Sequence, residues 1–330
     1  MNRRRFLCAL SLAPIVGPIA AEAQQAEKVY RVGFLNPRAA TSPPEAGLKA
    51  FQDTLRERGY VEGQNITIDY RWAEGKEDRL RAFAAELVGL RVDVIFAVSS
   101  IAVRAARNAT PTIPIVALDL ETDPVASGLA ASLARPGGNV TGVFLDQPEL
   151  HAKWLQLLRE VAPTVTRVAV LRDAATDPAG LRALEAAARQ LAMQQLQVLD
   201  VRVADDLGNA FQAAKKGRAE ALMVFQSPAF AVARTERRIA DLAVANRLPT
   251  ITMFKSLVEA GGLLSYGVNL YDVMARATLL LDKVLKGAKP SHLPVERPLR
   301  FDLAVNLKTA KALGLTIPPS LLLRADQVIE

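Results

Sequence analysis

The sequence predicts an α/β protein with two doubly wound lobes, each built on a parallel sheet. Three observations lead to this fold class. Short apolar runs alternate with helical patterns, as in successive β-α-β units. The alternation stops between residues 119 and 141 and then resumes with a second set of units. Beyond an N-terminal leader about 305 residues remain, which is enough for two domains of ordinary size.

The leader, residues 1–23, has the features of a cleaved secretory signal. Three arginines at residues 3–5 precede an apolar stretch at residues 6–20, and Ala-Glu-Ala at residues 21–23 is typical of a signal-peptidase site. The apolar stretch is too short to span a bilayer of roughly 30 Å. We expect a periplasmic protein cleaved near Ala23. The basic leader leaves general secretion and twin-arginine export both open.

Cysteine and charge exclude several classes of function. The one cysteine, Cys8, lies in the leader, so the mature chain is predicted to have no disulfide, thiol nucleophile or thiolate metal site. The net charge of the full chain is +7, and its basic residues are spread along the sequence. Nucleic-acid-binding proteins usually cluster their basic residues, so no nucleic-acid partner is expected. We also expect no stable membrane insertion after cleavage.

The first set of units begins with an apolar strand at residues 30–35. Ser-Pro-Pro-Glu at residues 42–45 is typical of a capping box, with proline in the first turn of the helix that follows. Alternating residues at 66–70 predict a half-buried strand near an edge of the sheet. Two further apolar strands are expected at residues 92–98 and 115–118, with a helix between the second and third strands.

Residues 119–141 break this pattern, since they hold a Pro-Gly-Gly turn and only a short helical piece. We interpret them as a crossover between lobes. The second set starts with a helix through Trp154, without a flexible Pro/Ser-rich linker. Its expected strands are residues 168–171, 197–201, 221–225, 250–252 and 263–266, followed by a helix at 273–285.

The chain lacks the motifs of common enzymes. Its two histidines, His151 and His292, are expected at the surface, and there is no nucleophile elbow, His-Glu-x-x-His or phosphate-binding loop. The glycine-rich residues 136–142 precede a strand, which favours a turn over a dinucleotide site. We therefore predict a protein that is not an enzyme and uses no cofactor. An α/β enzyme that works with carboxylates such as Asp119 and Asp173 stays open as an alternative.

Ligands of open α/β sheets bind outside the carboxyl ends of the strands. The residues at these ends are amides, hydroxyls, aromatic rings and a few charges, which suit a small polar or zwitterionic solute. The predicted ligand-binding residues are Asn36, Ser99, Ser100, Asp119, Arg172, Asp173, Phe225, Gln226, Thr252 and Tyr266.

Each group of candidates has a structural alternative. Ser99 and Ser100 could simply cap the helix that follows them. Phe225 and Tyr266 could belong to the core, and Arg172 could pair with a nearby acid. Trp72 also ends a strand, but this strand looks peripheral, so packing is favoured over binding there.

Three acids alternate at Asp119, Glu121 and Asp123. They lack the glycine turn and distal glutamate of a calcium loop, so no metal site is predicted. A solvated or hinge-capping loop and a ligand-contacting loop are equally favoured. For a zwitterionic ligand we expect Ser99 and Ser100 to hold the carboxylate, with Asp119 facing the ammonium group.

Several blocks of sequence are specific to one family. They are RGYVEGQNI at 58–66, YRWAEG at 70–75, DPV at 123–125, SLARPGGNVTG at 132–142, GGLLSYG at 261–267, LPVE at 293–296 and NLKTAKALGL at 306–315. Over nearly the whole mature chain the sequence resembles the ABC transporter substrate-binding family that includes tryptophan-binding importer components.

This resemblance implies a type I periplasmic-binding-protein fold, in which three crossings join two lobes that clamp a ligand. By this analogy Asp119 lies at the first crossing, Tyr266 at the second, and residues 295–300 form the third. Lobe 1 would hold residues 28–142 plus 268–296, and lobe 2 residues 143–267 plus 297–330.

The function expected from the resemblance is the extracytoplasmic solute-binding component of an ABC importer. Its partners would be a small-molecule ligand, an amino acid or related organic solute, and the membrane permease subunits. A ligand-sensing subunit for a membrane receptor is the alternative.

Overall fold

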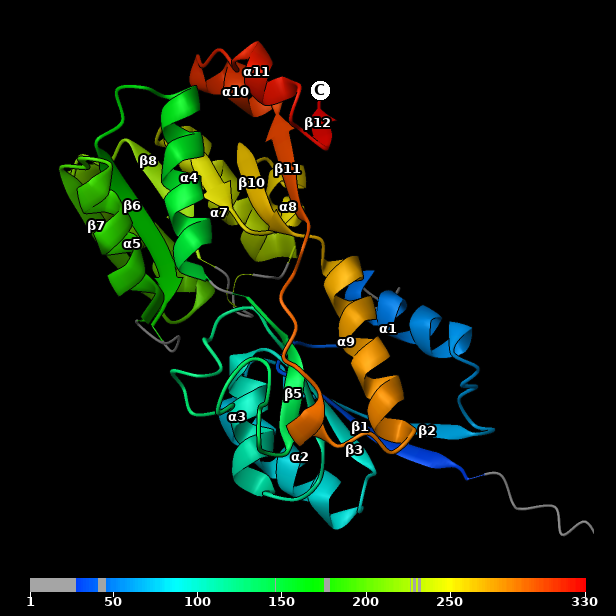
Figure 1. Ribbon diagram of the computed structural model, residues 1–330. Coiled ribbons are helices and arrows are strands. Elements are labelled where there is room, and N and C mark those ends of the chain that lie inside the picture. The colour runs from blue at the N-terminus through cyan, green and yellow to red at the C-terminus, as the bar shows by residue number, and fades with distance from the viewer. Residues whose placement is uncertain are drawn as a thin grey trace, which may run out of the picture.

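The protein folds into two α/β lobes joined by three crossings, and this confirms the predicted fold class (Figure 1). The computed structural model describes residues 28–40, 46–145, 147–174, 179–225, 227, 230 and 233–330. The expected leader at 1–23, the capping box at 42–45 and Gln226 lie outside the described residues.

The first lobe contains a five-stranded sheet in which every pair is parallel, in the order β2-β1-β3-β4-β5. The edge position expected for residues 66–70 is confirmed, because β2 is an outer strand. The strands are β1 (Tyr30–Asn36), β2 (Ile66–Trp72), β3 (Val94–Val98), β4 (Ile115–Asp119) and β5 (Val140–Phe144).

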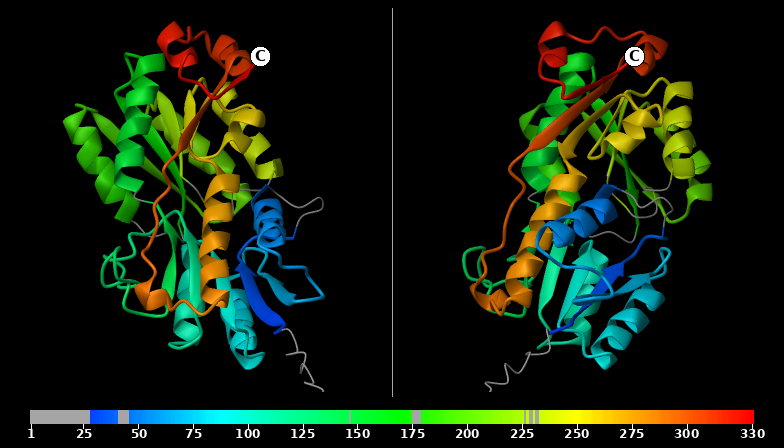
Figure 2. Two further views of the ribbon diagram at one scale, coloured as in Figure 1. Left: turned by 45° about the vertical axis from the view of Figure 1, so that its right-hand side comes forward. Right: turned by 90° about the vertical axis from the view of Figure 1, so that its right-hand side faces the viewer.

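Alternating side chains divide the core of this lobe between the two faces of the sheet. Val32 and Phe34 pack with α1 (Ala46–Glu57) and α9 (Leu270–Leu285), which lie side by side on one face (Figure 2). Leu35 on the same strand packs on the other face, against α2 (Glu77–Gly89) and α3 (Ser100–Ala109). The last strand, β5, leads from its carboxyl end to α4 of the second lobe, so the carboxyl ends of all five parallel strands face that lobe.

The second lobe contains a seven-stranded sheet in the order β12-β11-β10-β9-β8-β6-β7. The expected parallel arrangement holds from β7 to β10, whereas β11 runs antiparallel to β10 because the chain enters it from the opposite lobe. The strands are β6 (Arg167–Asp173), β7 (Gln195–Val201), β8 (Ala221–Val224), β9 (Thr250–Thr252), β10 (Leu264–Val268), β11 (Phe301–Asn306) and β12 (Gln327–Ile329).

Helices also cover both faces of this second sheet. Val168 packs toward α4 (Gln147–Val161) and α5 (Ala179–Gln190), whereas Ala169 packs toward α6 (Leu207–Lys216) and α7 (Ala233–Ala245). Three short helices follow later strands: α8 (Lys255–Glu259), α10 (Leu307–Leu313) and α11 (Pro319–Leu322). Two short 3-10 turns, η1 (Ala204–Asp206) and η2 (Pro290–His292), complete the described helical elements.

The lobes are joined where β5 leads to α4, where β10 leads to α9, and where residues 297–300 lead to β11 (Figure 1). The expectation that residues 119–141 cross between lobes is wrong, because this segment returns to the first sheet as β5. Asn269 caps α9 at the second crossing, and its side-chain amide donates to Asp302 on β11 at 2.9 Å. The second and third crossings are therefore bonded to each other.

A buried acid fixes α9 to the first lobe. Asp282 on α9 is 2% exposed and accepts hydrogen bonds from the Tyr60 hydroxyl at 3.0 Å and from Arg58 at 3.1 Å. Lys286, one turn further along, pairs with the same carboxylate at 2.8 Å. Part of the block at residues 58–66 thus attaches a helix more than 200 residues away in sequence to its sheet.

Candidate functional site

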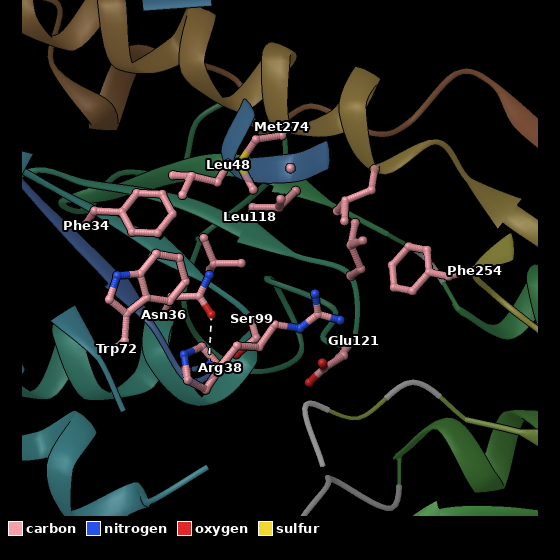
Figure 3. Close-up of a pocket in the computed structure, with 15 residues that line it drawn as sticks. Phe34, Asn36, Arg38, Leu48, Trp72, Ser99, Leu118, Glu121, Phe254 and Met274 are labelled. Carbon is pink, nitrogen blue, oxygen red and sulfur yellow. Dashed lines mark hydrogen bonds between the residues drawn. The ribbon is translucent and has the colours of Figure 1, made fainter. Parts of the chain in front are cut away.

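The carboxyl ends of the first sheet and the start of α9 enclose a cavity of about 740 Å³, which includes solvent space at its mouth. The second lobe contributes Phe254, which faces the aromatic residues of the first lobe across the cavity (Figure 3). The cavity is lined by Phe34, Asn36, Pro37, Arg38, Gly47, Leu48, Trp72, Val98, Ser99, Leu118, Leu120, Glu121, Phe254, Leu270 and Met274.

Most of the wall is aromatic or aliphatic. Trp72 ends β2 and Phe34 lies two residues before the end of the neighbouring β1, and their ring centroids lie 5.5 Å apart. Met274 from α9 closes the wall from above in the close-up view (Figure 3). An apolar wall with few polar groups is typical of a pocket that binds a small organic molecule.

The polar part of the lining is concentrated after β1, β3 and β4. Asn36 accepts a hydrogen bond from the Arg38 backbone N–H at 2.9 Å, which fixes the turn after β1. Ser99 precedes α3 with φ at 79°, a left-handed conformation that is strained for a residue other than glycine. The Ser100 hydroxyl in the first turn of α3 donates a hydrogen bond to Glu121. Glu121 is half-buried and lines the cavity.

The three alternating acids have three different environments. Asp119 is 0% exposed, and one carboxylate oxygen accepts the backbone N–H groups of Glu121 at 2.9 Å and Thr122 at 3.1 Å. Its other oxygen has no hydrogen-bond partner among the described residues. Asp123 is exposed and caps a turn by accepting the N–H of Val125. Among the three, only Glu121 lines the cavity.

Burial shifts the titration of the two inner acids. Burial raises the pKa of Asp119 to about 6, against the opposing effect of the N–H groups that its carboxylate accepts. Burial also raises the pKa of Glu121 to about 7, and the charges of Asp119 and Asp173 add to this shift. The Ser100 hydroxyl and Arg104 oppose it. The two acids therefore share a site where holding two negative charges is unfavourable.

The candidates of the second lobe are spread over several places. Asp173 ends β6, accepts a hydrogen bond from the Ser227 hydroxyl at 2.6 Å and lies near enough for its charge to act on Glu121. Arg172, beside it, turns away and pairs with Asp200 on β7 at 2.7 Å. The charge of Asp173 thus reaches Glu121 although Asp173 does not line the cavity, and Arg172 is held by the neighbouring strand.

The remaining candidates lie outside the cavity lining. Phe225 and Thr252 line a small crevice in the second lobe that shares Phe254 with the main cavity. Tyr266 stacks on Phe301 beside the third crossing, with ring centroids 5.7 Å apart. The cavity thus brings Asn36, Ser99 and Glu121 together with Phe254.

The structure corrects the expected position of one histidine. His292 is exposed as expected, whereas His151 is only 1% exposed. The ring of His151 stacks on Phe225 with centroids 4.3 Å apart and meets the edge of Trp154 at 5.3 Å. The packing of α4 against the sheet covers His151, so a position near the start of this helix does not place the side chain at the surface.

Trp72 and Glu121 are the main cavity residues that the list of ligand candidates omitted. Trp72 was assigned to packing because its strand is peripheral. That strand is at the edge, but its last side chain leans over Phe34 and reaches the cavity. A signal was present, since Trp72 ends a strand at the same edge of the sheet as Asn36.

Two other kinds of feature are absent from the described residues. Among the described residues, no group of three or more His, Cys, Asp or Glu has an arrangement that could hold a metal ion. No helix in the described ranges combines the length and the apolarity needed to cross a bilayer.

Comparisons with known proteins agree with this architecture. Residues 45–329 match the family model described as ABC transporter substrate binding protein. A "Tyrosine-binding protein" of Clostridioides difficile strain R20291 is 26% identical over 269 residues, which cover 81% of this chain and 76% of that protein.

Two solved structures are similar over 91% of this chain and 99% of theirs, at 25% identity each. An ABC domain from Streptococcus pneumoniae in complex with L-Trp superposes with a TM-score of 0.82. The ligand-free, open structure of a substrate-binding protein with adhesive properties from Clostridium difficile gives 0.66. The match to the family model covers most of the chain, and the chain belongs to the ABC transporter substrate-binding protein family, with two lobes in a type I periplasmic-binding-protein fold.

Proposed function

We propose that this protein is the extracytoplasmic solute-binding subunit of an ABC importer and clamps an amino acid or related small organic solute between its lobes. The observation that carries the proposal is the cavity, whose wall is completed by Phe254 from the second lobe. Closure over a ligand is explained only if the closed form binds it more tightly than the open form. A wall shared by both lobes provides that difference.

The chemistry of the wall supports an amphipathic ligand. Phe34, Trp72 and Phe254 offer stacking surfaces, whereas Asn36, Ser99 and Glu121 offer hydrogen-bonding groups. The tyrosine and L-Trp named for two relatives are ligands of this kind. The lobes also superpose better on the L-Trp complex than on the ligand-free, open relative. The stacking surfaces and the hydrogen-bonding groups of the wall favour a solute that has an apolar body and a charged end.

Transport explains the two-lobed architecture better than catalysis. A closed protein sequesters the solute and presents both lobes to the permease subunits of the importer. The sequence features of residues 1–23 support export to the periplasm, followed by cleavage near Ala23.

Tryptophan fluorescence tests the proposal, because the chain has two tryptophans in different environments. Trp72 lines the cavity, whereas Trp154 is fully buried and donates its ring N–H to the Tyr266 carbonyl. We expect one class of solute in a panel of amino acids, small carboxylates, amines and polyols to change the emission. The same solute should stabilise the fold by about 2.7 kcal/mol at a hundred times its dissociation constant.

The matched variants Trp72→Phe and Trp154→Phe assign the signal. The emission change should be lost in Trp72→Phe and kept in Trp154→Phe, while thermal stabilisation persists in both. A panel in which no solute of any class stabilises the protein or changes its emission would contradict the proposed function.

A further inference from the structure

The charges of acids from both lobes act on one side chain of the cavity wall, Glu121. Glu121 lines the cavity, Asp119 is buried two residues before it, and Asp173 acts on Glu121 from the second lobe. Like charges repel strongly where water is partly excluded. The described positive groups that act on or face Glu121 are Arg104 on α3 and Arg38 at the cavity wall. With all three acids ionised, their negative charge exceeds the positive charge of these two arginines. Closing the lobes is then unfavourable unless a cationic group on the ligand enters the cavity.

The start of α3, which could otherwise hold a ligand carboxylate, is already occupied by the carboxyl group of Glu121. The Ser100 hydroxyl donates to Glu121, so a carboxylate of the protein lies where a ligand carboxylate was expected. A second carboxylate at this position would be repelled by Glu121 at the cavity wall and by the charge of the buried Asp119. A cationic group, by contrast, would be attracted by both charges.

Two polar atoms in this part of the site have no hydrogen-bond partner among the described residues. One is the second carboxylate oxygen of Asp119, which is fully buried, and the other is the Ser99 hydroxyl at the cavity wall. Buried polar groups are nearly always hydrogen-bonded. Of these two atoms only the Ser99 hydroxyl lines the cavity, where a group on the ligand can reach it. An ammonium group carries three donors and fits acceptors of this kind.

We propose that the acids beside α3 form an ammonium subsite: the protein recognises its solute through a protonated amine held by Glu121, and one proton leaves the Asp119–Glu121 pair as the amine enters. Protonated Glu121 releases its proton to water, and the resulting carboxylate accepts a hydrogen bond from R–NH₃⁺. No other bond forms or breaks. The inference rests on the proposed function, because it names the chemical group by which the clamped solute is recognised.

The raised pKa values of the pair agree with this exchange, since the unliganded acids hold a proton near neutral pH. Placing a cation beside them lowers their pKa and expels that proton. The pair loses one proton and gains one ammonium charge, so the net charge that acts on Asp173 is unchanged. The exchange therefore accounts for recognition of the amine and not for closure of the lobes.

Matched triplets of probes test the subsite by isothermal titration calorimetry at pH 8. Each triplet holds an amino acid, its amine and its deaminated acid: L-tryptophan, tryptamine and indole-3-propionate; L-phenylalanine, phenethylamine and 3-phenylpropionate; L-leucine, 3-methylbutylamine and 4-methylpentanoate. In the best-binding triplet, the amine-bearing members should bind about tenfold or more tightly than the deaminated acid, in the range for a charged hydrogen bond.

Proton release is measured at pH 6.5 in phosphate and imidazole buffers, whose ionisation enthalpies differ. The wild-type protein should release a measurable fraction of a proton, up to about one per amine bound. Glu121→Gln should lose both the preference for amines and the proton release. Glu62→Gln, an exposed residue at the opposite edge of the same sheet, is the matched control and should keep both.

The outcomes separate this inference from the proposed function. Deaminated acids that bind as tightly as amino acids, a panel in which no amine-bearing probe binds, or binding without proton release would each overturn the ammonium subsite. If a carboxylate or polyol instead binds and closes the lobes, the importer function stands and the subsite is wrong. Binding of no solute in any class would overturn both.

Discussion

The pair formed by Asp119 and Glu121 should make the stability of the unliganded protein depend on pH. Burial raises the pKa of both acids, so the folded chain binds protons more tightly than the unfolded chain. The stability that this provides is fully present below the unfolded pKa, near 4.5 for glutamate, and is lost as pH rises through the folded pKa. The unfolding free energy should therefore fall between about pH 4.5 and about pH 7.

The variant Glu121→Gln isolates this effect. Removing a repelled charge should make the unliganded protein more stable at pH 8, on the order of 1–2 kcal/mol, because the cavity mouth admits screening solvent. Urea unfolding at pH 5 and pH 8 measures the difference, and subtracting the two proteins cancels the other titrating groups. A variant as pH-dependent as the wild type would show that Glu121 is not the source.

At the level of single residues, the sequence predicted the parts of the site that follow directly from strand ends. Asn36 and Ser99 line the cavity because parallel strands place their final residues at one edge. Glu121 is named in the sequence analysis only as one of three alternating acids, because its position at the cavity depends on the turn that Asp119 imposes by accepting the Glu121 N–H. Trp72 is predicted to pack, because only the fold shows that the last side chain of this edge strand reaches the cavity.

At the level of elements, Gly142 should be essential to the pairing of β4 with β5. A Cβ at Gly142 would lie 2.1 Å from the carbonyl oxygen of Ala117, and neither backbone can move without breaking the pairing. Gly142→Ala should destabilise the protein by about 2 kcal/mol or more, as overpacking does. Thermal or urea unfolding measures this.

Gly138, in the same glycine-rich segment, provides the control. A Cβ at Gly138 meets no atom within 4 Å, and its φ lies outside the left-handed region. Gly138→Ala should therefore change stability by less than about 0.5 kcal/mol. Equal losses in the two variants would mean that the backbone contact at Gly142 is not the cause.

The attachment of α9 through Asp282 should stabilise the fold and hold one wall of the cavity. Asp282→Asn keeps the shape but removes the charge that accepts from Arg58 and Tyr60, so we expect a loss on the order of 2 kcal/mol. Ligand affinity should fall as well, because Met274 on the same helix lines the cavity. Asp205→Asn removes an exposed ion pair and should have little effect in the same unfolding assay.

The elements that the sequence did not predict are those whose formation depends on distant partners. The alternation of Phe301, Leu303 and Val305 is typical of a strand, but the sequence analysis predicts only the crossing that precedes these residues and no strand after it. The strand exists because β10 offers an antiparallel edge. The three residues of β12 are too short to give a pattern and form by pairing with β11. Parallel strands that are each followed by a helix are easier to predict, because the sequence of such a unit shows the strand period of two residues and then the helix period of about 3.6 residues.

At the level of the whole molecule, two acids from different lobes whose charges interact should make lobe closure depend on pH. Glu121 and Asp173 belong to different lobes and repel when both are charged. Small-angle scattering should therefore give a larger radius of gyration for the unliganded protein at pH 8 than at pH 5.5. A bound solute should reduce the radius at pH 8.

In Glu121→Gln the radius of gyration should no longer change with pH, whereas Glu62→Gln should behave as the wild type. A radius that is unchanged by saturating solute would indicate a rigid pocket. It would contradict the clamp even if the affinity were high.

The order in which the chain supplies its parts affects how the protein is made. The first sheet is complete at Phe144, yet its covering helix α9 ends at Leu285, and residues 293–296 bond to β5 later still. The second sheet needs β12, which ends at Ile329, one residue before the C-terminus. Neither lobe can therefore finish folding until nearly all of the chain has left the ribosome. Pairings so distant in sequence form slowly. We therefore expect the newly made polypeptide to stay incompletely folded until its last strands have emerged.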